Sequence, residues 1–219
     1  MIVEAHLLCW NESETIAFTV RYYRQFCDRV IIHDNFSDDN TREIAESEGA
    51  EVRMFGIAGE LNDLEYKKLK NSCWKGSKAD WVIVADCDEI LYHHNYLHKI
   101  LSDSKDSGYT IFETRGFNIY SNDMPKESFL EIQTGIMDDS YSKHVIFNPQ
   151  AITDINYEFG AHAHFKPIQG NVNYSPVKLW LLHYRCIGGA ERVVNRHALY
   201  RPRLSAINKK WNLGHHYNH

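Results

Sequence analysis

Three carboxylates lie within four positions, directly after a run of apolar residues. The run is Val82–Ala85, and Asp86, Asp88 and Glu89 follow it. Carboxylates this close repel one another, and a hard divalent cation relieves the repulsion while leaving positions free for phosphate oxygens. The pattern therefore indicates a cation site at the end of a buried strand. A solvated loop whose acids cap a helix is the plainer alternative.

Polar side chains also end two earlier apolar runs. Asn11 and Glu12 follow the strand-length run Val3–Cys9, and Asp34 follows the β-branched run Arg29–His33. Ligands of parallel α/β sheets gather beyond the carboxyl ends of the strands, so we expect these side chains near the acidic cluster. A turn-forming role is the alternative for Asp34.

The elements that must position these residues alternate in type along the first half of the chain. Apolar runs and helical spacing predict the order β-α-β-α-β-α-β. Strands are expected at Val3–Cys9, Arg29–His33, Glu51–Phe55 and Trp81–Ala85, and helices at Glu14–Cys27, Thr41–Ser47 and Leu61–Lys75. This alternation predicts an α/β fold with a mainly parallel central sheet flanked by helices.

The second half is more irregular, with a polar stretch over residues 118–143. Helices are expected at Asn95–Asp103 and Gly189–Arg201, and strands at Tyr109–Glu113, Lys143–Asn148 and Val177–His183. No internal repeat or linker is visible, so we expect residues 1–219 to form one domain.

Composition excludes several classes of protein. With 24 Lys and Arg against 29 Asp and Glu, the net charge is −5, which offers no basic field for nucleic acid or an anionic membrane. The chain start has no signal-peptide pattern and no run reaches the length of a membrane span, so a cytoplasmic location is expected. The five cysteines are scattered and show no zinc-type spacing, which favours reduced packing residues.

Taken in order, the motifs resemble those of family 2-like glycosyltransferases of GT-A fold, in particular the small bacterial and viral type with a D-x-D-E motif. The resemblance covers most of the chain. It lies in Asn11-Glu12, Asp34–Asp39, Asn71, Trp74, Asp86–Glu89, Lys143, His162, His183-Tyr184, Arg203–Ser205 and His216-Tyr217. It implies a nucleotide-sugar-binding half at 1–115 and an acceptor-binding, metal-completing half at 116–219.

The resemblance also implies roles for single residues. Asp34 would contact the nucleotide base and the loop Leu8–Glu12 would wrap it, with Asn71 also in the nucleotide site. Asp86 would lie near the ribose and the metal, and Asp88 would ligate the metal, Mn²⁺ or Mg²⁺.

Histidines and cations of the second half complete the expected site. His183 ends the apolar run VKLWLLH, at the place where GT-A enzymes have a histidine that ligates the metal. The alternative is a buried histidine that serves only in packing. His162 is preferred over His164 as a site residue, because alternate strand residues face opposite sides. The candidates to stabilise the leaving phosphate are Lys143, Arg185 and the tail with His215 and His216. The alternative for Lys143 and Arg185 is an ordinary surface charge, and the alternative for the tail is a frayed terminus.

The expected reaction is transfer of a sugar from a nucleotide-sugar, with UDP as the expected nucleotide, to a hydroxyl of a glycan, lipid or protein, with inversion. Inversion needs a base, for which Glu158, Asp138 and Asp139 are candidates, although no clear Glu-Asp pair stands at the expected place. A sugar nucleotidyltransferase is an alternative, but LLCWNESE replaces the glycine-rich basic loop usual in such enzymes. A non-catalytic nucleotide-sugar-binding module is the other alternative.

Overall fold

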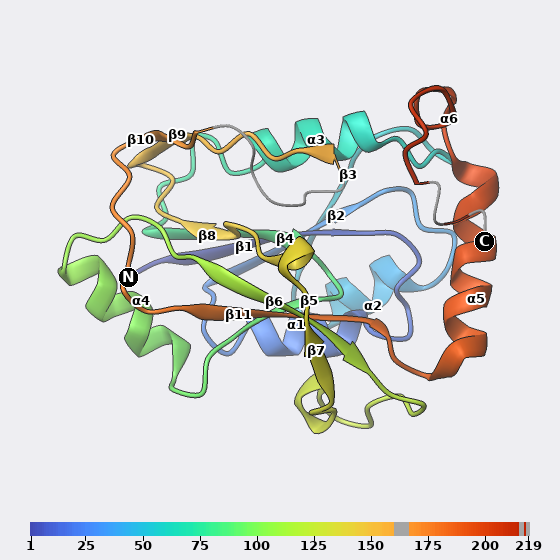
Figure 1. The fold of residues 1–219 in the computed structure, drawn as a ribbon, viewed down its shortest axis with the longest axis horizontal. Helices are drawn as coiled ribbons and strands as arrows, with labels where there is room; N and C mark the ends of the chain where they lie inside the picture. The colour runs from blue at the N-terminus through green and yellow to red at the C-terminus, as the bar shows by residue number, and fades with distance from the viewer. Residues whose placement is uncertain (160–166, 215–216, 218–219) are drawn as a thin grey trace.

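A mainly parallel sheet forms the centre of the molecule. The structure, a computed structural model, describes residues 1–159, 167–214 and 217. The central sheet has the order β3-β2-β1-β4-β8, in which only β8 is antiparallel to its neighbour (Figure 1). Its strands are β1 (Val3–Cys9), β2 (Arg29–Asp34), β3 (Glu51–Met54), β4 (Trp81–Asp86) and β8 (Ile146–Phe147).

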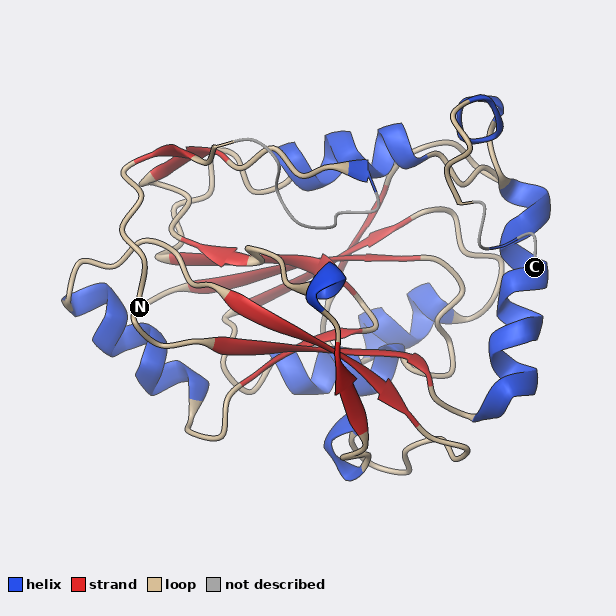
Figure 2. Cartoon of the chain, viewed as in Figure 1, coloured by secondary structure: helices blue, strands red, loops and turns tan. Residues whose placement is uncertain are grey.

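Helices cover both faces of this sheet. In Figure 2, α1 (Ile16–Tyr23) and α2 (Thr41–Ser47) lie on one side, and α3 (Asp63–Ser72) lies on the other. Val3, Ala5 and Leu7 of β1 belong to the same buried apolar cluster as α1. Because successive strand residues face opposite sides, Glu4, His6 and Leu8 point to the α3 side.

A second sheet carries the other half of the candidate site. Its order is β5-β11-β6-β7, from β5 (Glu89–Tyr92), β11 (Leu179–Cys186), β6 (Thr114–Tyr120) and β7 (Gly135–Met137). The register places His183 of β11 between Glu89 of β5 and Asn118 of β6. Since β5 follows β4 after a two-residue turn, the second sheet brings His183 to the end of β4.

The remaining elements surround these sheets. They are α4 (Leu97–Asp106), β9 (Ile152–Asp154), β10 (Gln169–Gly170), α5 (Gly189–Tyr200), α6 (Ala206–Lys210) and the short 3₁₀ turns Phe129–Glu131, Asp139–Tyr141 and Arg201–Arg203. Figure 1 shows α4 and α5 at opposite ends of the molecule, with α5 beyond the carboxyl ends of β1 and β4. No helix in the described ranges is long and apolar enough to cross a membrane.

The expected α/β class with a mainly parallel sheet is confirmed. One expected strand is wrong: Tyr109–Glu113 makes only isolated bridges, through Ile111 to Phe147 and Tyr174, and the strand β6 begins at Thr114. Ile111 and Phe112 are fully buried because this segment lies beside β8 and places its successive side chains in two different apolar clusters. The apolar run was therefore a core segment without ladder pairing.

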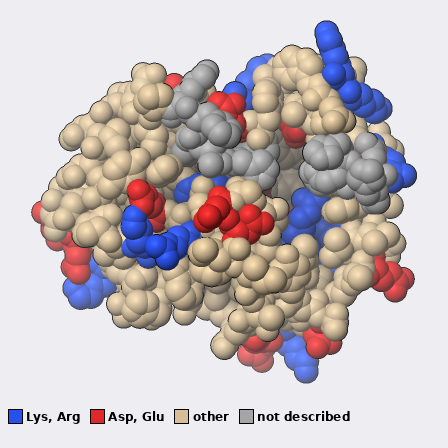
Figure 3. Space-filling view, viewed as in Figure 1, with Lys and Arg blue, Asp and Glu red and all other residues tan. Residues whose placement is uncertain are grey.

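Acidic and basic side chains are interspersed on the face in Figure 3.

Candidate active site

A cavity of about 550 Å³ opens beyond the carboxyl ends of β1 and β4. The loop after β1, the β4–β5 turn, α3, β11 and α5 all contribute to its wall. Seven residues expected at the site from the sequence line it: Leu8, Glu12, Asp86, Asp88, Lys143, His183 and Arg185.

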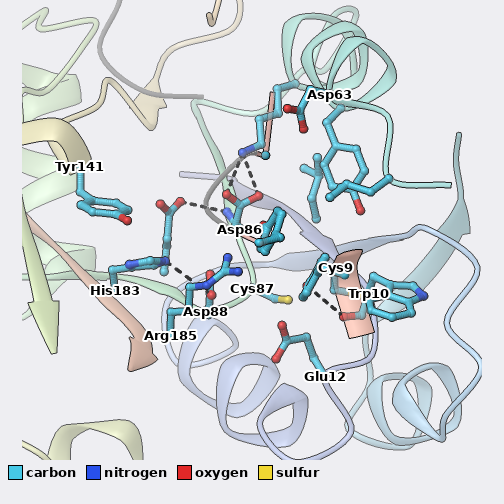
Figure 4. Close-up of a pocket in the computed structure, with 18 of the residues that line it drawn as sticks. Cys9, Trp10, Glu12, Asp63, Asp86, Cys87, Asp88, Tyr141, His183 and Arg185 are labelled. Carbon is cyan, nitrogen blue, oxygen red and sulfur yellow. Dashed lines mark hydrogen bonds and ion pairs between the residues drawn. The ribbon is translucent and has the colours of Figure 1, made fainter. Parts of the chain in front are cut away.

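Asp88 and His183 face each other in this cavity (Figure 4). The distance from Asp88 Oδ2 to His183 Nε2 is 3.5 Å, and both side chains are largely buried. Burial would raise the pKa of Asp88, but His183, Arg185 and Arg196 outweigh burial and hold it well below its usual range. Asp88 is therefore an ionised carboxylate.

Asn118 determines which nitrogen of His183 carries the proton. Asn118 Nδ2 donates to Asp138 Oδ2 at 2.9 Å, which turns Asn118 Oδ1 toward His183 Nδ1, also at 2.9 Å. An amide oxygen only accepts, so His183 Nδ1 carries a proton and donates; when the ring is neutral, Nε2 presents a lone pair toward Asp88. Tyr141 stacks on the same ring, with centroids 4.4 Å apart.

The Asp88–His183 pair fits a divalent cation. A carboxylate oxygen and an imidazole lone pair repel each other at this distance unless a proton or a cation lies between them. A ring oriented through its other nitrogen is also the usual arrangement of a metal-binding histidine. Mn²⁺ suits a mixed carboxylate and imidazole set, and Mg²⁺ suits the oxygens.

Asp86 has a different partner. Lys70 Nζ lies 2.8 Å from Asp86 Oδ1 and 2.9 Å from Oδ2, and the lysine is buried. Asp86, Asp88 and His183 do not bring three ligand atoms within 4.8 Å of one another among the described residues. Two of the three expected metal ligands thus come together, while Asp86 lines the cavity beside Lys70.

Glu89, the last acid of the motif, braces the turn. Its Oε1 forms an ion pair with Lys143 Nζ, both side chains being almost fully buried. Its Oε2 accepts the backbone N–H of Asp86 at 3.0 Å. Burial would lower the pKa of Lys143, but Glu89, Asp86 and Asp88 raise it, so the ammonium group stays charged.

Arg185 brings an incompletely paired guanidinium into the cavity. Its guanidinium carbon lies 5.4 Å from the ring centroid of Tyr200 and 5.1 Å from that of Tyr217. Its Nη2 is buried and has no hydrogen-bond partner within the described part of the chain. A buried donor without a partner is costly, and an anionic ligand in the cavity would supply one.

Arg196 is a residue that sequence reasoning missed. It pairs with Glu12 through two hydrogen bonds, that from Nη1 to Oε2 being 2.8 Å. The pair joins α5 to the loop after β1 and gives Glu12 a fixed partner. An arginine on an exposed-looking helix gives no signal of such a contact, because Glu12 is remote in sequence.

Asn11 and Asp34 shape the loops that border the cavity. Asn11 has a positive φ of 51° and its backbone N–H donates to Ser37 Oγ at 2.8 Å. Asp34 is fully buried and accepts the backbone N–H of Ser37 at 2.8 Å. Neither belongs to the described lining of the cavity. Trp10 does, and Arg203 lies 3.5 Å above its ring centroid.

The other expected site residues lie around this centre. Asn71 Oδ1 accepts the backbone N–H of Tyr157 at 2.6 Å and so holds that segment against α3. Glu158 Oε2 lies 3.4 Å from Lys67 Nζ, a lysine of the cavity wall. Asp138 caps the turn Asp139–Tyr141. His162, His215 and His216 lie outside the described residues.

Comparisons with known proteins bear on this site only through the family. No curated protein sequence is similar enough to count as a match. Among solved structures, glucosyl-3-phosphoglycerate synthase from Mycobacterium tuberculosis, in complex with Mn²⁺, UDP and glucosyl-3-phosphoglycerate, is 16% identical, with a TM-score of 0.37 over 52% of this chain and 44% of that one. Mannosyl-3-phosphoglycerate synthase from Rubrobacter xylanophilus is 19% identical, with a TM-score of 0.39 over 53% and 40%.

S. aureus TarS is 14% identical, with a TM-score of 0.47 over 68% of this chain and 28% of that one. The present chain thus spans less than half the length of each of these three proteins. The model of the glycosyl transferase family 2, in contrast, matches residues 6–181. That match covers most of the chain, and the chain belongs to glycosyl transferase family 2.

Proposed function

We propose that this protein is a metal-dependent glycosyltransferase that moves a sugar from a nucleotide-sugar, a UDP-sugar, to a hydroxyl group of a glycan, lipid or protein. The observation that carries the proposal is the Asp88–His183 pair, with the imidazole tautomer set by Asn118, in the wall of the cavity at the end of β4. Family membership supplies the reaction class.

The cation-binding pair and Arg185 define where the diphosphate of the donor lies. When bound between Asp88 and His183, Mn²⁺ or Mg²⁺ supplies positive charge that stabilises the departing diphosphate. Arg185 donates to a phosphate oxygen from Nη2, which has no partner among the described residues. The aromatic rings of Tyr200 and Tyr217 restrict the motion of Arg185, so little side-chain entropy is lost when the donor binds.

The nucleoside part of the donor lies along the loop after β1. Leu8, Trp10 and Glu12 line the cavity there, and Asp86, held by Lys70, offers acceptor oxygens to the ribose hydroxyls. Asp34 and Asn11 act by holding this loop in shape. The donor thus uses residues of the half 1–115, while His183 and Arg185 of the half 116–219 complete the metal and phosphate sites.

Transfer with inversion needs a base on the acceptor side. Asp138 already accepts from Asn118 with Oδ2 and from Ser140 with Oδ1, so it positions the metal-binding histidine. Glu158 is the better base candidate, because its carboxylate lies 3.4 Å from Nζ of Lys67, a residue that lines the cavity. A carboxylate there would take the proton of the acceptor hydroxyl.

The test is a screen of nucleotide-sugars with Mn²⁺, in which both binding and donor consumption are measured. We expect a donor that raises Tm by mass action and is slowly hydrolysed or transferred. The Asp88→Asn variant should lose consumption, whereas Asp103→Asn, at an exposed carboxylate of α4, should keep it. Binding without consumption would favour a non-catalytic module, and synthesis of a nucleotide-sugar from sugar 1-phosphate and nucleoside triphosphate would favour a nucleotidyltransferase.

A further inference from the structure

A second group of metal-ligand side chains lies on the α3 side of the central sheet. His6 of β1, His33 of β2 and Cys73 at the end of α3 bring one ligand atom each within 4.8 Å of one another. We propose that these three residues bind a transition-metal ion of the zinc type. None of them lines the cavity that contains Asp88 and His183, so this site is separate from the catalytic one.

The two imidazoles are close to the spacing that a shared ion requires. His6 Nδ1 lies 3.1 Å from His33 Nε2. With Zn–N near 2.0–2.1 Å and Zn–S near 2.3 Å, tetrahedral ligand atoms are about 3.3 to 3.6 Å apart. A movement of a few tenths of an ångström separates the nitrogens enough, and a rotation of the Cys73 side chain brings the sulfur to the same ion.

The second nitrogen of His6 supports this arrangement. His6 Nε2 is buried and has no hydrogen-bond partner among the described residues, while Glu4 Oε2 lies 3.8 Å away. When Nδ1 binds a metal, Nε2 carries the proton and faces the Glu4 carboxylate. Metal-binding histidines commonly donate their other N–H to a carboxylate in this way.

Charge and protonation are compatible with a bound cation. Burial lowers the pKa of His6 to about 4 and that of His33 to about 3, so both rings are neutral near pH 7. Burial raises the pKa of the Cys73 thiol to about 12, and a metal would displace its proton. The cavity beside the site is lined by the cations Arg29, Arg53, Lys75 and Lys78. Three of them have acidic partners: Arg29 pairs with Glu4 at 2.7 Å, Arg53 with Glu51 at 2.7 Å and Lys75 with Asp154 at 3.6 Å.

The ligand set selects the ion. Two imidazoles and a thiolate favour Zn²⁺ over Mg²⁺, which prefers oxygen ligands. A cavity of about 350 Å³, lined by His6 and Cys73, leaves the fourth position open to water. Such an ion would tie β1 and β2 to the end of α3, the helix that carries Lys70 and Lys67 to the catalytic cavity.

Cobalt provides a spectroscopic test that does not depend on activity. The Asp88→Asn protein, which lacks the proposed catalytic ligand, is titrated with Co²⁺ and then with Zn²⁺. We expect one equivalent of Co²⁺ to give a thiolate-to-cobalt charge-transfer band that Zn²⁺ removes, and Zn²⁺ to raise Tm. In the Asp88→Asn background, Cys73→Ser and His33→Gln should each abolish or strongly weaken the band, whereas Cys27→Ser, at a buried thiol in another part of the core, should keep it.

Circular dichroism shows whether each variant is folded. If either Cys73→Ser or His33→Gln is unfolded, the other variant still tests the site. A folded Asp88→Asn protein that gives no charge-transfer band would overturn the proposal. A band that persists in Cys73→Ser and disappears in Cys87→Ser would also overturn it, because the cobalt would then lie at the catalytic cavity.

Discussion

Asp88 and His183 lie far apart in the chain, yet a backbone hydrogen bond holds them side by side. The backbone N–H of Tyr184 donates to the carbonyl oxygen of Asp88 at 2.8 Å, and the two side chains approach to 3.5 Å. The β11–β5 pairing places His183 opposite Glu89, so strand register fixes this approach. His183 thus lies in the sheet, and Asp88 lies in the two-residue turn that leads into β5, the strand paired with β11.

Substitution of either residue should change the metal dependence of transfer. Asp88→Ala removes the charged ligand, and we expect activity to fall by more than about a hundredfold. His183→Ala should weaken Mn²⁺ affinity by about 10- to 100-fold and recover part of its activity at high Mn²⁺. Initial rates measured against Mn²⁺ concentration separate the two effects.

The double variant should lose less than the product of the single losses, because residues that serve one ion act as a unit. Chelation should abolish activity, and added Mn²⁺ should restore it. An unchanged Mn²⁺ dependence in His183→Ala would remove His183 from the metal site and return it to the core.

Asn118→Ala should weaken metal binding through His183. Without Asn118 Oδ1, the proton of the imidazole is no longer held on Nδ1, and part of the population presents the wrong tautomer. We expect about tenfold weaker Mn²⁺ affinity, with kcat near that of the unmodified protein once Mn²⁺ is saturating. Isothermal titration with Mn²⁺ and rates at saturating Mn²⁺ give the two values.

The exposed-loop variant Asn95→Ala is the matched control and should change neither value. A loss of kcat in Asn118→Ala that high Mn²⁺ does not correct would show that Asn118 acts on the fold or on the substrate instead.

Local patterns in the sequence were sufficient for the first half of the fold. Strand β1 was expected at its observed bounds, and α2 likewise, because apolar periodicity and the turn residues between elements act over short distances. The expectation failed at Tyr109–Glu113, where a buried segment makes isolated bridges to Phe147 and Tyr174 and forms no ladder. Burial without ladder pairing leaves the same sequence pattern as a buried strand.

The site was harder to predict where its contacts join distant segments. The acids at and just after the end of β4, and the histidine that ends the apolar run Val177–His183, stand out by type and position. Asn118 and Arg196 do not, because an asparagine in a polar stretch and an arginine on a helix are ordinary surface residues until the register and the helix position are known. Lys70 shows the same limit, since it lies on a polar-looking helix and yet is buried against Asp86.

The Lys143–Glu89 ion pair should contribute strongly to the free energy of unfolding. Lys143→Met leaves a buried carboxylate without its cation, and we expect a loss of about 3–5 kcal/mol in urea denaturation. Lys143→Met combined with Glu89→Gln should lose less than Lys143→Met alone, because the amide is neutral and can still accept the backbone N–H of Asp86.

Lys99→Met is the control for this pair, because Lys99 forms an exposed pair with Asp103 on α4. We expect it to change the free energy of unfolding by at most about 0.5 kcal/mol. Equal losses in Lys143→Met and in the double variant would mean that the apolar packing of Lys143, and not its charge, stabilises the turn.

Arg185→Met should weaken binding of the diphosphate without affecting binding of the nucleoside. The two flanking tyrosine rings hold this guanidinium in the cavity that also contains the Asp88–His183 pair, and its Nη2 has no hydrogen-bond partner in the part of the chain that the structure describes. A hydrogen bond to a charged group contributes about 1.5–3 kcal/mol, so UDP affinity should fall by about 10- to 100-fold. Uridine, which has no phosphate, should bind Arg185→Met as it binds the unmodified protein.

Calorimetric titration with UDP and with uridine, both in the presence of Mn²⁺, measures the two effects separately. Arg21→Met is the control, because Arg21 of α1 is exposed, pairs with Glu48 at the end of α2 and does not line the cavity. Equal weakening for UDP and uridine, with an unchanged Tm, would place Arg185 at the nucleoside and leave the metal as the main contact of the diphosphate.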